Sequence, residues 1–221
     1  MLADLRLYQL ISPSLPIGAF TYSQGLEWAI EAGWIKNEQA LEQWLESVLA
    51  HSVSTLELPV MIRLCRAFEG QDVEAVHYWT QFLIASRETS ELRKEERQRG
   101  QALATLLPNL NVAMDDSVIE AVRSTQIAGF ALAAQQFDIS IQSACAGYLW
   151  SWLENAVMAG VKLVPLGQTS GQKLLMRLSE RVPTAVERAL AIVDDEVGSS
   201  TPALAIASSR HETQYTRLFR S

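Results

Sequence analysis

Residues 21–25 carry a serine whose setting suggests covalent chemistry. The stretch Thr21-Tyr22-Ser23-Gln24-Gly25 differs from the G-x-S-x-G pattern of a hydrolase nucleophile because Thr21 replaces the first glycine. A nucleophile elbow also needs a strand before the turn and a histidine base. Nothing before residue 21 has the pattern of a strand. The candidate bases are the chain's three histidines, His51, His77 and His211. A small serine hydrolase using Ser23 is therefore an alternative, and not the leading interpretation.

Residues 165–175, PLGQTSGQKLL, resemble a phosphate-binding loop only in part. The full pattern is G-x-x-x-x-G-K-[ST], in which backbone N–H groups surround the phosphates and the lysine reaches them. Here Gly167 and Gly171 are one residue too close, and Gln172 separates Gly171 from Lys173. We expect this segment to be the start of a helix.

The cysteines and histidines do not form a metal-binding pattern. The two cysteines, Cys65 and Cys145, lie far apart in apolar surroundings, which predicts buried free thiols. C-x-x-C, H-x-x-x-H and H-E-x-x-H are missing from the sequence, and His211-Glu212 is a weak metal signal. We expect neither a tight metal site within one chain nor a cofactor.

Composition and charge narrow the possible partners. The 221 residues are 48% hydrophobic and 19% charged, with a formal net charge of −7. A negative chain is unsuited to neutralising nucleic-acid phosphates. The N-terminus lacks the pattern of a signal peptide. The apolar region at 139–165 is interrupted by polar residues and reads as a buried helix, not a membrane span. We expect a soluble cytoplasmic protein that binds neither nucleic acid nor membrane.

Helical periodicity dominates the chain, and convincing strand alternation is absent. Asn37 and Asp72 are suitable helix N-caps, and a break is expected near Thr125. The pattern predicts an all-α single domain over residues 1–198, with roughly nine or ten helices. The expected helices cover residues 2–10, 20–32, 37–49, 55–70, 72–85, 89–107, 116–138, 140–164, 169–181 and 184–197.

The last segment, 199–221, differs from the rest of the chain. It is rich in Ser, Thr and Ala and contains three arginines against one acid. A cationic tail on an acidic body could fold back on that body or dock elsewhere. Chain ends are disordered unless contacts hold them, so we expect a flexible C-terminal tail that docks on a partner. Its apolar residues Tyr215, Leu218 and Phe219 could serve as anchors.

Two helical segments allow more than one interpretation. Residues 87–100 carry five bases and four acids. They predict a solvated helix face with i,i+4 pairs such as Glu95–Arg99, or else a polar partner-binding face. The segment at 140–164 has small residues among tryptophans. We expect core packing there, with a helix-mediated homodimer as the sharper alternative.

Three blocks of sequence resemble the UreF family of urease accessory proteins. They are residues 7–35, 150–175 and 210–221, and they follow one another in the order seen in that family. The resemblance implies an all-α cytoplasmic chaperone for nickel insertion into urease, without catalysis of its own. It also implies a homodimer that assembles with UreD (also called UreH), the GTPase UreG and apo-urease. A generic helical scaffold without a metal role is the other alternative.

The same resemblance places partner-binding residues at the two ends of the chain. Tyr22 and Arg217 are the family positions most closely tied to assembly. Residues with weaker claims lie in the same motifs, and they are Ser23, Gly25, Arg210, His211, Glu212, Tyr215 and Phe219. We expect a Tyr22–Arg217 contact, by hydrogen bonding or cation–π attraction, to tie the tail to the first loop.

Overall fold

The computed structural model describes residues 1–199 and 201–221, and of Ala19 the backbone only. In these residues every regular element is a helix, so the predicted all-α class is confirmed. The α-helices are α1 (Leu2–Leu10), α2 (Leu26–Glu31), α3 (Glu38–Val48), α4 (Leu58–Glu69), α5 (Val73–Ala85), α6 (Ser90–Leu106), α7 (Ile119–Ser124), α8 (Gln126–Gln136), α9 (Ile141–Leu163), α10 (Gln168–Ser179), α11 (Val182–Ala191) and α12 (Pro202–His211). The shorter turns and the π-helical segment are η1 (Ala19–Thr21), η2 (Leu49–Glu57), η3 (Leu107–Leu110) and η4 (Asp194–Glu196).

Several predicted helix boundaries are confirmed by their caps. The side chain of Asn37 accepts a hydrogen bond from the N–H of Ala40 at 2.9 Å, and Asp72 accepts one from Ala75 at 2.9 Å. Such side chains satisfy N–H groups that have no partner inside the first turn. Thr125 is extended between α7 and α8, at the expected break.

The expected break between residues 49 and 55 is wrong. α3, η2 and α4 form one continuous helix over Glu38–Glu69. The hydrogen-bond pattern changes to the π type in η2, where the Ser54 hydroxyl donates to the carbonyl of Leu49 at 2.6 Å. Pro59 is the second residue of α4, and a proline has no N–H to pair with a preceding carbonyl. The hydrogen-bond register changes just before it, and the helix continues through this position.

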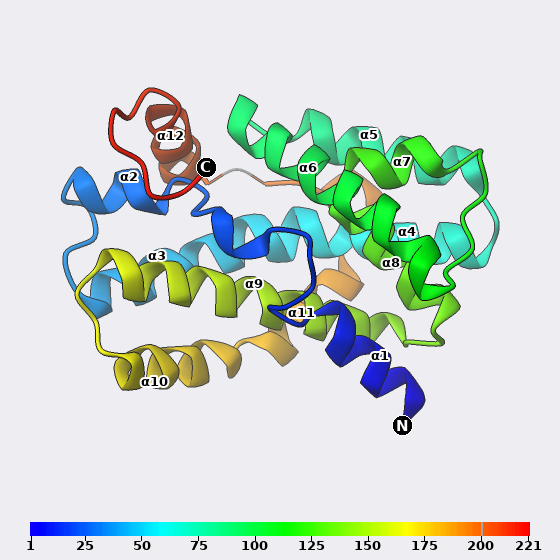
Figure 1. The fold of residues 1–221 in the computed structure, drawn as a ribbon, viewed down its shortest axis with the longest axis horizontal. Helices are drawn as coiled ribbons and strands as arrows, with labels where there is room; N and C mark the ends of the chain where they lie inside the picture. Colours follow the sequence, from blue (N-terminus) through cyan, green and yellow to red (C-terminus); the bar gives the residue numbers. More distant parts are fainter. Residues whose placement is uncertain (200) are drawn as a thin grey trace.

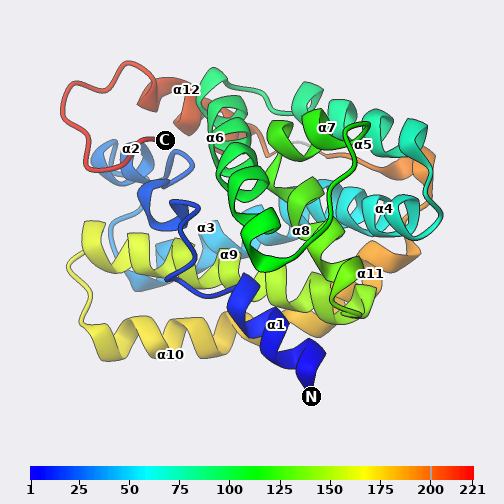
Figure 2. The same cartoon turned by 45° about the vertical axis from the view of Figure 1, so that its right-hand side comes forward.

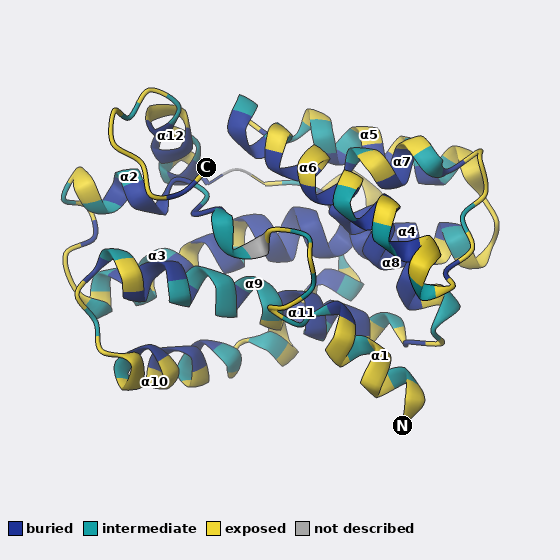
Figure 3. Cartoon of the chain, in the orientation of Figure 1, coloured by how far each residue is buried: buried dark blue, intermediate teal, exposed yellow. Residues whose placement is uncertain are grey.

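The helix Glu38–Glu69 is long and apolar enough to cross a membrane by composition, but 89% of its most apolar window is buried inside the molecule. It is dark along most of its length in Figure 3. The burial fits the core helix of a soluble protein.

α9 is the second central helix, and Figure 1 shows it between α3 and α10. A Cβ on Gly160 would lie 2.4 Å from Leu41 of α3, and one on Gly147 would lie 2.7 Å from Leu7 of α1. The small residues of α9 therefore let neighbouring side chains pack directly on its backbone. The core-packing interpretation of this helix is confirmed.

Both cysteines are free and buried, as expected. Burial raises the pKa of the Cys65 thiol to about 12, and it also raises the pKa of Cys145. Because the thiolate is the reactive form, these thiols behave as small core residues.

α2 begins later than the expected start at residue 20. η1 is followed by an extended residue, Tyr22, and then by Gln24 and Gly25 with φ of 53° and 81°. A left-handed backbone interrupts a helix, so α2 starts only at Leu26. The backbone of residues 23 and 24 binds the other end of the chain, as described below.

The expectation of a flexible tail after residue 198 is wrong for most of that segment. Residues 202–211 form α12, which packs on α2 and α6 (Figures 1 and 2). Ala207, Ser208 and His211 are fully buried, and Phe219 and Ser221 are buried as well. Small residues on α12 permit the close approach to α2, and polar groups of the body pair with the tail.

Substitution of Gly100 tests the crossing of α6 over the α7–α8 junction. A Cβ there would lie 2.7 Å from the carbonyl of Arg123 and 2.8 Å from the N–H of Thr125. We expect Gly100→Ala to lower the free energy of unfolding by about 1–3 kcal/mol, although alanine favours an unhindered helix. Urea unfolding followed by circular dichroism measures the change.

The matched control is Gly167→Ala, whose Cβ would meet nothing within 4 Å. An unchanged unfolding midpoint for Gly100→Ala would contradict the close crossing.

Candidate functional site

The loop between α1 and α2 binds the last residues of the chain. The carbonyl of Thr21 accepts a hydrogen bond from the N–H of Arg220 at 2.8 Å. The main-chain oxygen of Ser221 accepts three, from the N–H groups of Ser23 and Gln24 and from the Ser23 hydroxyl at 2.6 Å. The two ends of the sequence that carry the candidate residues therefore form one site.

Glu27, in the first turn of α2, holds the tail by its main chain. One carboxylate oxygen accepts from the N–H of Leu218 at 2.6 Å, and the other accepts from the N–H of Phe219 at 2.9 Å. Glu27 is only 7% exposed, and hydrogen bonds to a charged acceptor are strong when water is excluded. The Phe219 ring is buried beside them, with the Lys162 ammonium 5.8 Å from its centre.

His211 lies between two carboxylates in the interior. Its Nδ1 is 2.7 Å from Glu91, and its Nε2 is 3.3 Å from Glu27. Glu91 also accepts from the Arg217 guanidinium at 2.8 Å. Glu91 belongs to α6, His211 ends α12, and Glu27 begins α2. This cluster therefore fixes three helices and the tail at one point.

Glu212 binds the start of α6. One of its carboxylate oxygens accepts from the hydroxyl and the N–H of Ser90, both at 2.8 Å, and from the N–H of Glu91 at 3.3 Å. The hydrogen bonds from Ser90 hold the pKa of Glu212 below its ordinary value. A carboxylate at a helix N-terminus satisfies N–H groups that otherwise lack partners.

The expected contact between Tyr22 and Arg217 is wrong. The Tyr22 hydroxyl donates to Gln98 at 2.6 Å, while Arg217 pairs with Glu91. The expected link between tail and first loop is nevertheless confirmed. The link is made by main-chain groups of the tail. Such contacts cannot be predicted from the residue types of the tail, because every residue has the same main chain.

Among the residues that the structure describes, none is placed as a catalytic base for Ser23. Its hydroxyl donates to Ser221 and accepts from the N–H of Glu27 at 3.3 Å. The nearby histidine, His211, faces Glu27 and Glu91 instead. A nucleophilic serine needs a base within hydrogen-bond reach, so this geometry gives no support to the hydrolase alternative.

The remaining candidate residues divide by exposure. Gly25 is buried, and a Cβ on it would lie 2.6 Å from the N–H of Ser208 on α12. Arg210 is exposed, and Tyr215 is completely so. Tyr215 is the one predicted anchor that contributes no buried surface, whereas Phe219 is buried as expected.

The interpretation of residues 87–100 as a solvated face is confirmed for Glu88, Lys94, Arg97 and Gln98, which are exposed, and wrong for the opposite face. Glu91, Glu95 and Glu96 are each less than 8% exposed. The predicted Glu95–Arg99 pair forms, at 2.9 Å, but it is buried. Glu95 also accepts from Gln24 at 3.1 Å and from the Ser221 hydroxyl at 3.3 Å, so the acidic face of α6 is part of the site.

Arg87 is the centre of a second buried group. Its guanidinium pairs with Glu57 at 2.9 Å and with Glu96, and Glu57 accepts from the Tyr148 hydroxyl at 2.7 Å. Thr125 donates to Glu96. The sequence does contain one indication that this helix is covered. Gly100 lies inside the charged segment, and a glycine within a helix often marks close packing by a neighbouring element.

Metal ligands do not gather in the described residues. Within residues 1–199 and 201–221, no group of three or more His, Cys, Asp and Glu side chains is arranged to hold a metal ion. The acids of the site are instead occupied by His, Arg, Ser and backbone donors.

These contacts define a class of protein: an all-α domain in which the loop after the first helix and the buried acidic face of α6 bind the chain's own C-terminal segment. Comparison with known proteins gives the particular family. A family model described as UreF matches residues 35–179, and the chain belongs to the UreF family.

Full-length relatives extend the match to both ends of the chain, including the site. A protein of Alcanivorax borkumensis is 56% identical over 99% of this chain and 98% of its own length. One of Alkalilimnicola ehrlichii is 49% identical over 100% and 96%, and one of Klebsiella pneumoniae is 46% identical over 98% and 97%. All three bear the name urease accessory protein UreF.

Removal of the buried cation tests the group around Arg87. We expect Arg87→Met to lower the free energy of unfolding by about 3–5 kcal/mol, because two buried carboxylates lose their counter-charge. The matched control is Arg123→Met, which breaks an exposed pair with Glu120 and costs about 1 kcal/mol or less. Equal losses for the two variants, measured by denaturant unfolding, would contradict the assigned role of Arg87.

The pH dependence of stability tests the burial of Glu95. Burial raises the pKa of Glu95 above its ordinary value. A carboxyl with a raised pKa binds more protons in the folded than in the unfolded state, so its contribution to stability falls as pH rises from the unfolded pKa through the folded one. Glu95→Gln does not titrate. The free energy of unfolding of the wild type minus that of Glu95→Gln should therefore fall as pH rises from about 4.3 toward neutral.

Thermal unfolding across this pH range measures that difference. Glu120→Gln, which removes a carboxylate at an exposed position, is the matched control. A difference that grows with pH would mean that the ion pair with Arg99 outweighs burial.

Proposed function

We propose that this chain is a non-catalytic accessory protein of urease maturation in the cytoplasm. It would act as a chaperone for nickel insertion, assembling with UreD/UreH and bringing the GTPase UreG to apo-urease. The observation that carries the proposal is identity of 46–56% over nearly the full length to proteins named urease accessory protein UreF. We include a homodimer in the proposal, as the family resemblance implies.

The contacts of the candidate residues support a role without catalysis. Ser23, His211 and Glu27 all make hydrogen bonds that hold the tail. These hydrogen bonds stabilise the position of the tail, and none of the three side chains is positioned to activate a nucleophile. The assembly-factor hypothesis accounts for these contacts, whereas the hydrolase hypothesis leaves them unused.

We propose two roles within the partner-binding set. Tyr22, Ser23, Gly25, His211 and Phe219 are buried, and they would position the tail without contacting a partner directly. The half-buried Glu212 would do the same by binding the start of α6. Direct contacts would come from the exposed groups of the tail, namely Arg210, Tyr215 and the exposed part of Arg217.

Co-purification is the decisive experiment for the function. A tagged full-length chain should retain UreD/UreH, UreG and urease subunits, and deletion of its gene should lower the nickel content of urease. Retention of none of them, together with unchanged nickel content, would favour a helical scaffold without a metal role.

Tyr215→Ala tests the direct contact. An exposed aromatic anchor contributes about 2 kcal/mol or more to an interface, so we expect roughly 30-fold weaker binding of UreD/UreH. The control is Tyr78→Ala, at an exposed tyrosine on α5. Binding curves measured with purified components give the affinity of each variant for UreD/UreH. Equal affinity of the two variants would show that Tyr215 is not part of the interface.

A further inference from the structure

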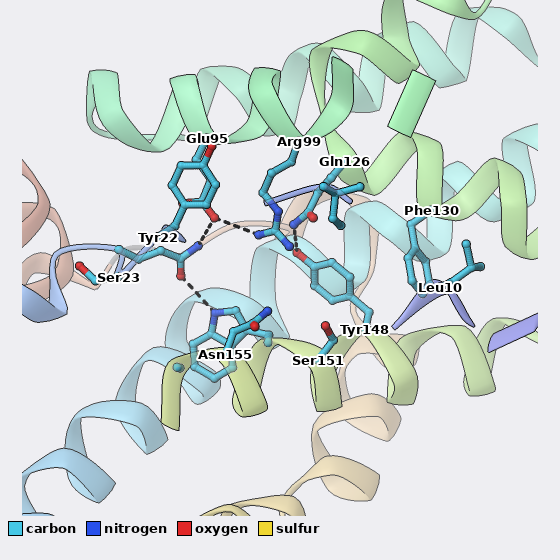
Figure 4. A pocket seen from close by; sticks show the side chains of 14 residues that line it. Leu10, Tyr22, Ser23, Glu95, Arg99, Gln126, Phe130, Tyr148, Ser151 and Asn155 are labelled. Carbon is cyan, nitrogen blue, oxygen red and sulfur yellow. Dashed lines mark hydrogen bonds and ion pairs between the residues drawn. The ribbon is translucent and has the colours of Figure 1, made fainter. Parts of the chain in front are cut away.

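A cavity lined by both polar and apolar side chains lies next to Ser23 and Gln24, the residues that bind Ser221. Its volume is about 50 Å³, and its walls come from the loop before α2 and from α6, α8 and α9. Figure 4 shows the side chains that converge on it. Gln24 lines the cavity, donating to Glu95 at 3.1 Å and accepting from the Trp152 indole at 3.1 Å.

Arg99 contributes a buried donor that has no partner in the described residues. Its Nη1 donates to Glu95 at 2.9 Å, but its Nε, which has no exposed surface, makes no hydrogen bond there. The residue as a whole is 8% exposed. A guanidinium keeps its protons at all ordinary pH values, so the free N–H requires an acceptor from outside the protein.

The charged groups that line the cavity favour a neutral acceptor. They are one carboxylate, Glu95, and one guanidinium, Arg99, and these two already pair with each other at 2.9 Å. An added ion would find no free counter-charge in the lining, and a buried charge without a partner is costly.

The other polar groups of the lining suit a molecule that both donates and accepts hydrogen bonds. Ser151 and Asn155 of α9 offer a hydroxyl and an amide, and Gln126 of α8 offers an amide whose nitrogen donates to Tyr148 at 3.3 Å. The remaining walls are apolar, from Leu10, Ile17, Phe130 and Ala156. A buried water usually makes about three hydrogen bonds and needs about 10–15 Å³. The available volume therefore suits a small cluster of waters.

We propose that this cavity is an internal water site, in which one ordered water accepts the hydrogen bond of the Arg99 Nε–H. The site completes the hydrogen bonding of α6 beneath the residues that bind Ser221. It is independent of the proposed role in urease maturation.

Crystals of the full-length chain test the proposal directly. We expect ordered water within hydrogen-bond distance of Arg99 Nε. Soaks with bromide and with xenon distinguish the alternatives. A bromide peak at Arg99 would show an anion site, and xenon in the cavity would show a dry one. Either result, or an Nε that binds a protein acceptor instead, would overturn the proposal.

Magnetic relaxation dispersion of water nuclei gives a second measurement in solution. Asn155→Leu removes a polar wall group at similar volume, and we expect the loss of at least one long-lived water per chain. The matched control, Asn109→Leu, changes an exposed asparagine and should lose none. Ser151→Ala is the second variant if Asn155→Leu does not fold. An unchanged count in a folded cavity variant would contradict the assignment.

Discussion

The fold depends on the burial of three carboxylates on one helix. Glu91, Glu95 and Glu96 of α6 are shielded from water, and a buried charge is tolerated only when it is paired and hydrogen-bonded. No single neighbour supplies all the donors. Glu91 takes them from the tail, Glu96 takes them from Arg87 and the α7–α8 junction, and Glu95 takes them from Arg99, the first loop and the last residue. Segments far apart in the sequence must therefore meet at α6.

The same requirement gives order to parts of the chain that lack a large apolar surface of their own. The tail buries the ring of Phe219 but leaves Tyr215 and Leu218 exposed. Its position is set mainly by Glu27, which binds two consecutive N–H groups and also faces His211. Loop, tail and α6 stabilise one another through polar contacts, while the apolar packing of α3, α4 and α9 forms the frame beneath them.

Much of the helical frame could be predicted from sequence, because its rules are local. The caps at Asn37 and Asp72 and the break at Thr125 follow from residue type and position. The continuous helix through η2 could not be predicted, because residues 51–55 are mostly polar and the change to π-type bonding shifts the apolar stripe around the helix. The buried face of α6 was missed for a related reason. Helical spacing shows which charges share a face, but only the tertiary partners decide whether that face is covered. The candidate residues at both ends were found by resemblance, and their actual partners required the structure.

The attachment of the tail to Glu27 and Thr21 makes it insensitive to most side-chain changes. The N–H groups of three successive residues, Leu218, Phe219 and Arg220, are all in use, and an N–H is common to every amino acid except proline. At positions 218 and 220, where the side chains are exposed, any residue other than proline can keep these hydrogen bonds. The outer surface of the segment and its attachment are therefore set by different atoms of the same residues.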